Sequence, residues 1–387
     1  MNSQSRSNWR NLVAACAAIS VFGFAFGTSY PLLSLILESR GVSTRMIGIN
    51  SAMMPIGILL FASLIPVSTK HFGARNVAIA AAIATAIIIP AYKLFDSLEA
   101  WFILRLFQGM SISVLFVLSE TWIVKFAGDN QRGRIVAIYG SILSLSFGAG
   151  PALVGWLGIH GWAPFVISTI VVLLGIIPLT VIREENTKSP EETTTSGIVS
   201  FAPKAPILLF TVLVFAAYDA SSLSLLPVYG VQKGLDVATS ANMLTALIVG
   251  NVLLQFPIGW LADKFPKRLI LGICAILAAI FSSLIPASMG TFWMWPLLVL
   301  TGTFAYAVYN VALASLGDRF KGQELVAGTS AFATMWGIGA LIGSTSAGTT
   351  MEFMGPDGLP VFLFVIYLAL FIGLLWRTFT LRKNADQ

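Results

Sequence analysis

Long apolar runs recur along the whole chain, and the charged residues gather in the short segments between them. A helix needs about 20 mainly apolar residues to cross the hydrocarbon core of a bilayer. In the first half such helices are predicted over residues 11–37, 46–69, 75–95, 99–124, 134–158 and 162–183. In the second half they are predicted over residues 205–230, 238–263, 268–288, 292–316, 324–349 and 358–380. The predicted fold class is therefore all-α integral membrane, with twelve transmembrane helices.

The composition excludes an ordinary soluble domain. Apolar residues make up 57% of the chain and charged residues 10%, whereas soluble domains average about 45–50% and about 25%. The net charge of +6 does not indicate nucleic acid, because the basic residues are spaced between apolar runs. Cys16 and Cys274 lie singly in apolar segments, and His71 and His160 fall in separate predicted loops, so neither a metal site nor a cofactor is expected.

A polar segment divides the chain. Residues 184–204 are rich in Glu, Thr and Pro and have too little apolar surface to fold alone. The sequence therefore predicts an N-terminal six-helix bundle over 1–183, a cytoplasmic linker over 184–204 and a C-terminal six-helix bundle over 205–387.

The lysines and arginines are divided unevenly between alternate loops. With the N-terminus inside the cell, Arg40, Arg45, Lys93 and Lys233 fall outside and Arg105 falls within a span, while the rest of the 23 fall in cytoplasmic segments. The positive-inside rule then predicts a multi-pass protein of the plasma membrane with both termini cytoplasmic. The first apolar run is too long for a cleaved signal peptide and is expected to be retained.

The two halves repeat in register. A constant offset along the chain superimposes Gly41 on Gly234, Gly57 on Gly250, Phe72 on Phe265, Arg75 on Arg268 and Gly109 on Gly302. A half-chain repeat with the same number of spans predicts two bundles related by an axis along the membrane normal.

One apolar run of the second half ends in the sequence Pro-Ile-Gly-Trp-Leu-Ala-Asp-Lys-Phe-Pro-Lys-Arg. Gly259 is expected to let two helices approach closely, and Asp263 to cap a helix or form an ion pair. Lys264, Lys267 and Arg268 are expected to hold the loop at the anionic cytoplasmic interface. The stretch resembles the G-x-L-A-D-x-x-x-R-[RK] loop signature of the major facilitator superfamily (MFS).

The resemblance to this superfamily covers essentially the whole chain. The Ser-Glu-Thr-Trp ending of the span over 99–124 and the Arg-Gly-Arg before the span over 134–158 are most similar to its YcaD-like branch, with features of drug:proton antiporters. The resemblance implies two six-helix bundles that rock about a central substrate site. It does not identify a substrate, because one fold serves many functions.

Arg105 and Gly109 resemble the superfamily's R-x-x-x-G signature, whose arginine is associated with proton coupling. A guanidinium inside the hydrocarbon normally faces a cavity or a partner. Alternatively, Arg105 reaches the outer interface, which is about two helical turns away.

The segment from Ser146 to Gly155 resembles the antiporter signature G-x-x-x-G-P-x-x-G-G, which the family associates with export. Gly150, Pro151 and Gly155 match the signature, whereas Ser146 and Val154 replace two of its glycines. The remaining glycines and the proline still permit a kinked, closely packed helix.

Asp219 is the acid nearest the middle of a predicted span, and such a group is by default a functional candidate. Ser222, one turn away, is expected to hydrogen-bond to it. Asp219 and Arg105 are therefore the predicted proton-coupling residues. The alternative is a buried acid that a neighbouring helix satisfies and that has no part in transport.

Aromatic residues recur every four positions on the first predicted helix, at Phe22, Phe26 and Tyr30, beside the small pair Gly23 and Gly27. The resemblance implies that this helix lines the substrate cavity together with the tenth predicted helix. The predicted cavity residues are Phe22, Phe26, Tyr30, Ser222, Tyr306 and Asn310. Packing against lipid or other helices explains the stripe equally well.

The resemblance also implies a cytoplasmic gate, in which each half's loop meets a helix start of the other half. Asp263 is expected to pair with Arg134 and the adjacent helix N-terminus. Lys70 takes the place of the acid in the first half and is expected to pair with Glu324. The alternative is that these charges are simply solvated.

The favoured function is a proton-coupled secondary transporter, acting as a monomer in the bilayer and exporting small amphipathic compounds. No P-loop occurs in the sequence, so ATP is not expected to drive it. Uptake of a nutrient or metal ion is the alternative, with Met53, Met54 and Met110 as soft ligands. A membrane enzyme or assembly factor is more remote, because no nucleophile with a base falls at membrane depth.

Overall fold

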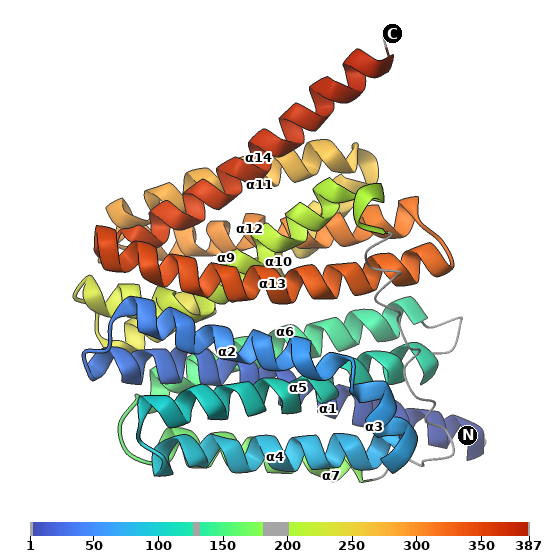
Figure 1. Cartoon of the computed structure of the whole chain (residues 1–387), viewed down its shortest axis with the longest axis vertical. Helices are drawn as coiled ribbons and strands as arrows, with labels where there is room; N and C mark the ends of the chain where they lie inside the picture. The colour runs from blue at the N-terminus through green and yellow to red at the C-terminus, as the bar shows by residue number, and fades with distance from the viewer. Residues whose placement is uncertain (1–2, 127–131, 181–200, 386–387) are drawn as a thin grey trace. The chain divides into compact units, whose positions relative to one another are not determined.

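The computed structural model describes residues 3–126, 132–180 and 201–385, and over these ranges it is helical with no β-strand (Figure 1). Side chains are described for residues 10–123, 135, 138–180, 201–255 and 257–377. The first half contains α1 (Ser3–Ser39), α2 (Thr44–Ala62), α3 (Ile65–Phe72), α4 (Ala74–Leu94), α5 (Leu98–Phe126), α6 (Arg132–Leu157) and α7 (Ala163–Leu179). The second half contains η3 (Ala202–Lys204), α9 (Pro206–Gln232), α10 (Val237–Lys264), α11 (Lys267–Ser288), α12 (Met294–Arg319), α13 (Gln323–Met354) and α14 (Gly358–Ala385).

The helices match the predicted spans closely. Within the described ranges, 11 helices are long and apolar enough to cross a membrane. The remaining apolar helix, α7, has 17 residues and ends at the edge of a described range. The all-α membrane fold with two sets of helices is therefore confirmed. Hydropathy predicts it well because every backbone N–H and C=O in a bilayer must be paired within a helix.

The chain forms two compact units. The first unit contains residues 1–36 and 53–192, and the second contains residues 37–52 and 193–387. In the first unit α4 packs against α5 and α7, and in the second α9 packs against α13 and α12 against α10 and α11. Most of the predicted linker lies outside the described residues. Its end forms η3, where Phe201 is buried and packs edge-on against Phe320 at a centroid distance of 4.9 Å.

The second predicted span is interrupted near its C-terminal end. α2 ends at Ala62 and the short helix α3 begins at Ile65, with Pro66 in its first turn. Proline has no backbone N–H, so Pro66 cannot donate the helical hydrogen bond to the carbonyl of Ala62, but proline is well tolerated at a helix start. Pro66 therefore explains why one predicted helix over 46–69 is two helices.

The same helix crossing occurs in both units. A Cβ placed on Gly57 would overlap the carbonyl oxygen of Leu106, and one placed on Gly109 would overlap that of Met54. In the second unit Gly250 meets Val299 and Gly302 meets Leu247 in the same way. The glycines are those that the sequence repeat superimposes. Close backbone contact therefore fixes α2 against α5 and α10 against α12.

The start of α10 is capped by Asp236. Its side chain accepts hydrogen bonds from the backbone N–H of Thr239 at 2.9 Å and from the Thr239 hydroxyl at 2.6 Å. These bonds satisfy one of the free N–H groups at the helix start. They also lower the pKa of the exposed Asp236 carboxyl below its usual range, because they stabilise its ionised form.

Candidate functional site

Asp219 lies in the middle of α9 and is 5% exposed. The hydroxyl group of Tyr306, on α12, donates a hydrogen bond of 2.8 Å to Asp219 Oδ1. Within the described part of the chain, no lysine, arginine or histidine forms an ion pair with Asp219. The acid is therefore held by one neutral donor rather than by a cation.

Aromatic rings surround this acid. Tyr218 lies edge-on to Tyr306 and to Tyr367, at centroid distances of 6.0 and 5.4 Å, and Phe215 lies 5.5 Å from Tyr306. An ionised carboxyl group is costly in apolar surroundings unless it is paired, whereas a hydroxyl donor stabilises the ionised form. Burial and the Tyr306 bond therefore act in opposite directions on the ionised form of Asp219.

The predicted hydrogen bond from Ser222 to Asp219 is wrong. Ser222 is buried beside Tyr218, and no bond to Asp219 is present among the described side chains. Ser221 and Ser224 donate instead to backbone carbonyls of their own helix. Of the residues predicted on α12, Tyr306 contacts Asp219, and Asn310 is half-buried one turn further along.

Arg105 on α5 is 0% exposed, so the alternative in which it reaches the outer interface does not hold in this structure. None of its three guanidinium nitrogens has a hydrogen-bond partner among the described residues. The carbon Cζ of the guanidinium lies 5.3 Å from the centroid of the Tyr30 ring. Arg105 is therefore a buried cation whose hydrogen-bonding groups are unused.

A hydrogen-bonded network of three helices lies beside this arginine. The Tyr92 hydroxyl on α4 donates to Gln108 Oε1 on α5 at 2.8 Å, and Gln108 Nε2 donates to Ser29 Oγ on α1 at 2.7 Å. Trp101 Nε1 donates to the backbone carbonyl of Tyr92 at 3.0 Å. Because these groups satisfy one another, they fix the helices around Arg105 without pairing it.

The predicted aromatic stripe of α1 forms a cluster of rings inside the first unit. Phe26 lies 4.7 Å from Tyr30 and 5.5 Å from Phe22, measured between centroids. Phe22 also lies 4.9 Å from Phe116 of α5, and Phe26 lies 5.5 Å from Phe147 of α6. The stripe therefore packs against helices and begins at the guanidinium of Arg105.

α1 and α6 cross at the segment that resembles the antiporter signature. A Cβ on Gly27 would overlap the carbonyl oxygen of Phe147, and one on Gly150 would overlap the backbone at Gly27. Ser146, which replaces a glycine of the signature, lies 3.2 Å by its Cβ from a Cβ placed on Gly23. Pro151 lies inside α6, and Gly155 follows it by one turn. The serine that stands at position 146 in place of the signature glycine is thus compatible with the close crossing of α1 and α6.

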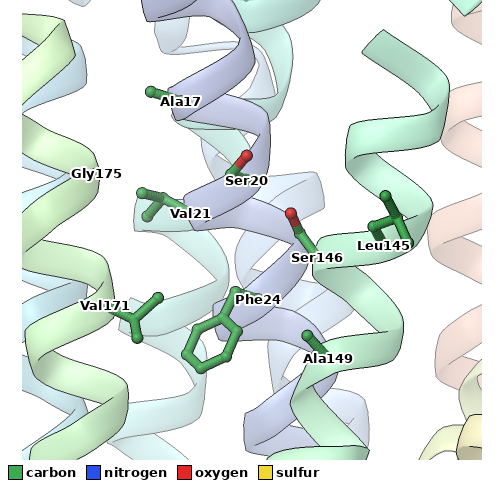
Figure 2. A pocket seen from close by; sticks show the side chains of 9 residues that line it. All are labelled: Ala17, Ser20, Val21, Phe24, Leu145, Ser146, Ala149, Val171 and Gly175. Atoms are coloured by element: carbon green, nitrogen blue, oxygen red, sulfur yellow. The ribbon is translucent and has the colours of Figure 1, made fainter. Parts of the chain in front are cut away.

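A cavity of about 570 Å³ opens beside this crossing, between α1, α6 and α7 (Figure 2). Figure 2 shows the side chains of α1 pointing toward α6 on one side and α7 on the other. The cavity is lined by Ala17, Ser20, Val21, Phe24, Leu145, Ser146, Ala149, Val171 and Gly175. None of the residues predicted for the substrate cavity lines it.

The loop between α10 and α11 is held within the second unit. Lys267 forms an ion pair with Asp318 at the end of α12, and Arg268 Nη2 donates to the carbonyl of Leu374 on α14 at 3.2 Å. Lys264 Nζ lies 3.9 Å from the centroid of the Trp260 ring. Lys267 and Arg268 therefore bind protein groups, beyond the attraction to lipid that the sequence predicts.

The role predicted for Gly259 is wrong for the described residues. A Cβ placed there meets no described atom within 4 Å, so the glycine makes no close helix approach. Asp263, at the end of the same helix, is exposed. The close approach of α10 is made at Gly250 instead, two to three turns earlier.

The structure places Glu324 in an ion pair with Lys204, both in the second unit and both about half exposed. Lys70 is exposed at the end of α3. The side chain of Arg134 lies outside the described residues. The two predicted gate pairs stay predictions, and Glu324 has a partner that the sequence did not indicate.

Glu120 is a candidate that the sequence analysis did not single out. It lies within the candidate membrane span Leu98–Ile123, yet its side chain is exposed. Its neighbour Ser119 hydrogen-bonds to the Tyr139 hydroxyl of α6 at 2.8 Å. An acid exposed at this depth is a functional candidate. The signal was present in the sequence, in the Ser-Glu-Thr-Trp ending of the span.

No group of three or more His, Cys, Asp or Glu side chains able to hold a metal ion occurs among the described residues. Arg105, Glu120 and Asp219 are charged side chains within the candidate membrane spans, and none of them belongs to such a group among the described residues.

Comparisons with known proteins identify the family of the chain. A sequence profile described as the Major Facilitator Superfamily matches residues 15–250 and 208–387. The chain is 25% identical over 373 residues to YfkF of Bacillus subtilis, an uncharacterised MFS-type transporter, covering 92% of this chain and 93% of the relative. It is 24% identical over 344 residues to YcaD of Escherichia coli, also an uncharacterised MFS-type transporter, covering 89% of each chain.

Solved structures show the same fold. The nucleoside transporter NupG superposes with a TM-score of 0.75 at 13% identity, covering 94% of this chain and 98% of NupG. A D-xylose-proton symporter superposes with a TM-score of 0.73 at 15% identity, covering 94% of this chain and 97% of the symporter. At these identities the likeness concerns the fold.

Proposed function

Because the chain belongs to the major facilitator superfamily, a family of membrane transporters rather than enzymes, we propose that it is a proton-coupled secondary transporter. It exports small amphipathic compounds by alternating access of a central site. It works as a monomer in the plasma membrane, with both termini in the cytoplasm, as the distribution of lysine and arginine favours.

The observation that carries proton coupling is the hydrogen bond from Tyr306 to Asp219. The carboxyl group is buried at mid-span, forms no ion pair with a described cation and has one neutral donor for its ionised form. Such a group can lose and regain a proton without breaking an ion pair. Arg105 remains the second coupling candidate, because it is the fully buried charged residue among the described side chains of the first unit.

Export is supported by the crossing of α1 and α6. The Gly27 and Gly150 contact keeps the packing that the antiporter-like segment requires, although Ser146 and Val154 depart from the signature. Uptake by symport is the second candidate, and its support is that a fold neighbour is a D-xylose-proton symporter.

Everted membrane vesicles allow both direction and coupling to be tested. Their cytoplasmic face is outside, so an exporter should concentrate an amphipathic dye in the lumen when the lumen is acidic. Fluorescein, ethidium and Nile red provide one anionic, one cationic and one neutral probe. Dye that leaves a preloaded lumen together with protons would instead show uptake in the cell. Movement of none of the three dyes under either gradient would contradict amphipath transport.

The Asp219→Asn variant tests the residue itself. We expect it to reach the membrane and to exchange dye across the vesicle at equal pH, but to lose accumulation driven by the pH gradient. Asp236→Asn is the matched control, because asparagine also caps a helix start and the residue lies outside the spans. Wild-type accumulation by Asp219→Asn would remove Asp219 from the coupling mechanism.

A further inference from the structure

No acidic side chain among the described residues pairs with the guanidinium of Arg105. The Arg105 side chain is 0% exposed, its guanidinium nitrogens have no hydrogen-bond partner among the described residues, and the ionisable side chains that interact with it electrostatically are Tyr92 and Tyr30. An uncompensated buried charge costs several kcal/mol by principle, so it persists only where function needs it. A ligand that carries negative charge would compensate it.

The polar groups around Arg105 cannot take this role. Gln108 is already bonded to Tyr92 and Ser29, and the Tyr30 ring lies against the guanidinium as a cation–π contact. Neither contact supplies a negative charge. The three helices that carry these groups are fixed by the network, so the guanidinium is held in a prepared position.

The aromatic cluster of the first unit begins at Tyr30, whose ring contacts the guanidinium of Arg105. From Tyr30 the rings continue through Phe26 and Phe22 along α1, with Phe116 and Phe147 alongside, each step between 4.7 and 5.5 Å. Three of these contacts are tilted and the one between Phe26 and Phe147 is stacked, and an aromatic ligand can join or replace contacts of this kind. A single fixed cation at one end of an apolar aromatic surface matches a molecule with one anionic end and a flat body.

We propose that the first unit binds the carboxylate of an amphipathic aromatic monoanion at Arg105, with the aromatic body packed on Tyr30 and Phe26. This assignment rests on the proposed transport function and defines its substrate class. A carboxylate accepts two parallel hydrogen bonds from a guanidinium, which an isolated arginine provides and an ammonium does not. A dianion such as phosphate would leave one charge unpaired, because the described residues place no second cation there.

Binding can be measured without any gradient on the full chain in lipid nanodiscs. Naphthoate is the probe, followed by its own fluorescence during titration. Naphthylmethanol and naphthylmethylamine have the same ring with a neutral or cationic end, and inorganic phosphate and chloride report a site for small anions. We expect saturable binding of naphthoate to the wild type, at least tenfold tighter than binding of the alcohol or amine, and no displacement by equal concentrations of phosphate or chloride.

Two variants distinguish the guanidinium from its charge. Arg105→Gln should weaken naphthoate binding at least tenfold, and Arg105→Lys should give an intermediate loss. Displacement of naphthoate by chloride or phosphate at equal concentration would replace the proposed ligand with an inorganic anion. Equal binding by wild type and Arg105→Gln, preference for the amine, or absence of naphthoate binding to the wild type would each overturn the proposal.

The thermal stability of the unliganded protein separates a ligand site from a structural arginine. Removal of an unpaired buried charge should leave the unfolding temperature of Arg105→Met equal to or above that of the wild type. A structural arginine would give a lower one, and that result together with unchanged binding would contradict the proposal. The Asp219→Asn variant should still bind naphthoate, so the failure of proton coupling and the failure of this site are distinguishable.

Discussion

The backbone of α5 lies directly against Gly57 of α2, where the carbonyl oxygen of Leu106 occupies the position that a Cβ would need. Gly250 has the same relationship to Val299 in the second unit, at the positions related by the sequence repeat. The repeat therefore preserves a backbone contact as well as a set of residues. Contacts of this kind hold helices together in lipid, where burial of apolar side chains gives little advantage.

This crossing predicts a contrast between two glycines of one helix. Gly250→Ala should destabilise the protein by about 1–3 kcal/mol, because the methyl group must displace backbone atoms. Gly259→Ala is the matched control on α10, since its methyl group meets no described atom within 4 Å. It should be neutral or stabilise slightly, as alanine favours a helix. Thermal unfolding in detergent measures both variants. Equal unfolding temperatures of the two variants would show that the contact between α10 and α12 at Gly250 does not determine the stability of the protein.

The cap at Asp236 predicts a dependence of stability on pH. The pKa of Asp236 is lower in the folded protein than in the unfolded chain, where it is about 3.9. The stabilisation of the folded state by the ionised cap is therefore complete above the unfolded pKa and is lost as the pH falls through the lower folded pKa. Asp236→Ala should lower the free energy of unfolding by about 1 kcal/mol at neutral pH. The difference from the wild type should shrink below about pH 4. A difference that stays constant down to pH 2 would show that the carboxylate form is not the cap.

The sequence predicted the helices well and the partners of the site residues poorly, for different physical reasons. A span is determined locally, because about 20 consecutive residues must satisfy the bilayer. The partner of Asp219 is Tyr306, which is 87 residues away on another helix. Ser222 was predicted instead because it is close along the chain, and a serine can also bond to its own helix backbone.

The glycines also show which kind of sequence feature predicts a contact between helices. The repeat indicated Gly57, Gly109, Gly250 and Gly302 together, and all four make close contacts. Gly259 belongs to a family signature, but it makes no such contact among the described residues. Glycines that recur at equivalent positions of the two halves therefore predicted close helix contacts better than a single glycine of a family motif.

The bond between Tyr306 and Asp219 predicts a non-additive pair. Tyr306→Phe removes the donor and should reduce dye accumulation driven by the pH gradient, with a smaller effect on exchange at equal pH. Adding Tyr306→Phe to Asp219→Asn should cause no further loss of accumulation, because the effects of two residues that act as one unit are not additive. Tyr367→Phe is the control, since its hydroxyl donates to the backbone of Ala305. Fully additive losses in the double variant would show that Tyr306 acts apart from Asp219.

The last prediction concerns Glu324, whose carboxylate pairs with Lys204 in the structure. We predict that in the outward-open state this carboxylate exchanges Lys204 for Lys70, while Asp263 pairs with Arg134. Lys70, Asp263 and Glu324 are exposed, so each pair should contribute no more than about 1 kcal/mol. Such a contribution still shifts a balanced equilibrium about fivefold.

Charge reversal tests the exchange in a protein that lacks Cys16 and Cys274, so that introduced cysteines report accessibility from the cytoplasm. Lys70→Glu should increase cytoplasmic accessibility, and adding Glu324→Lys should restore it. Lys204→Gln frees Glu324 from its present partner and should shift accessibility the opposite way. If the double reversal behaves like Lys70→Glu alone, Lys70 and Glu324 do not pair. Lys70 is then solvated, and Glu324 keeps its ion pair with Lys204 throughout the transport cycle.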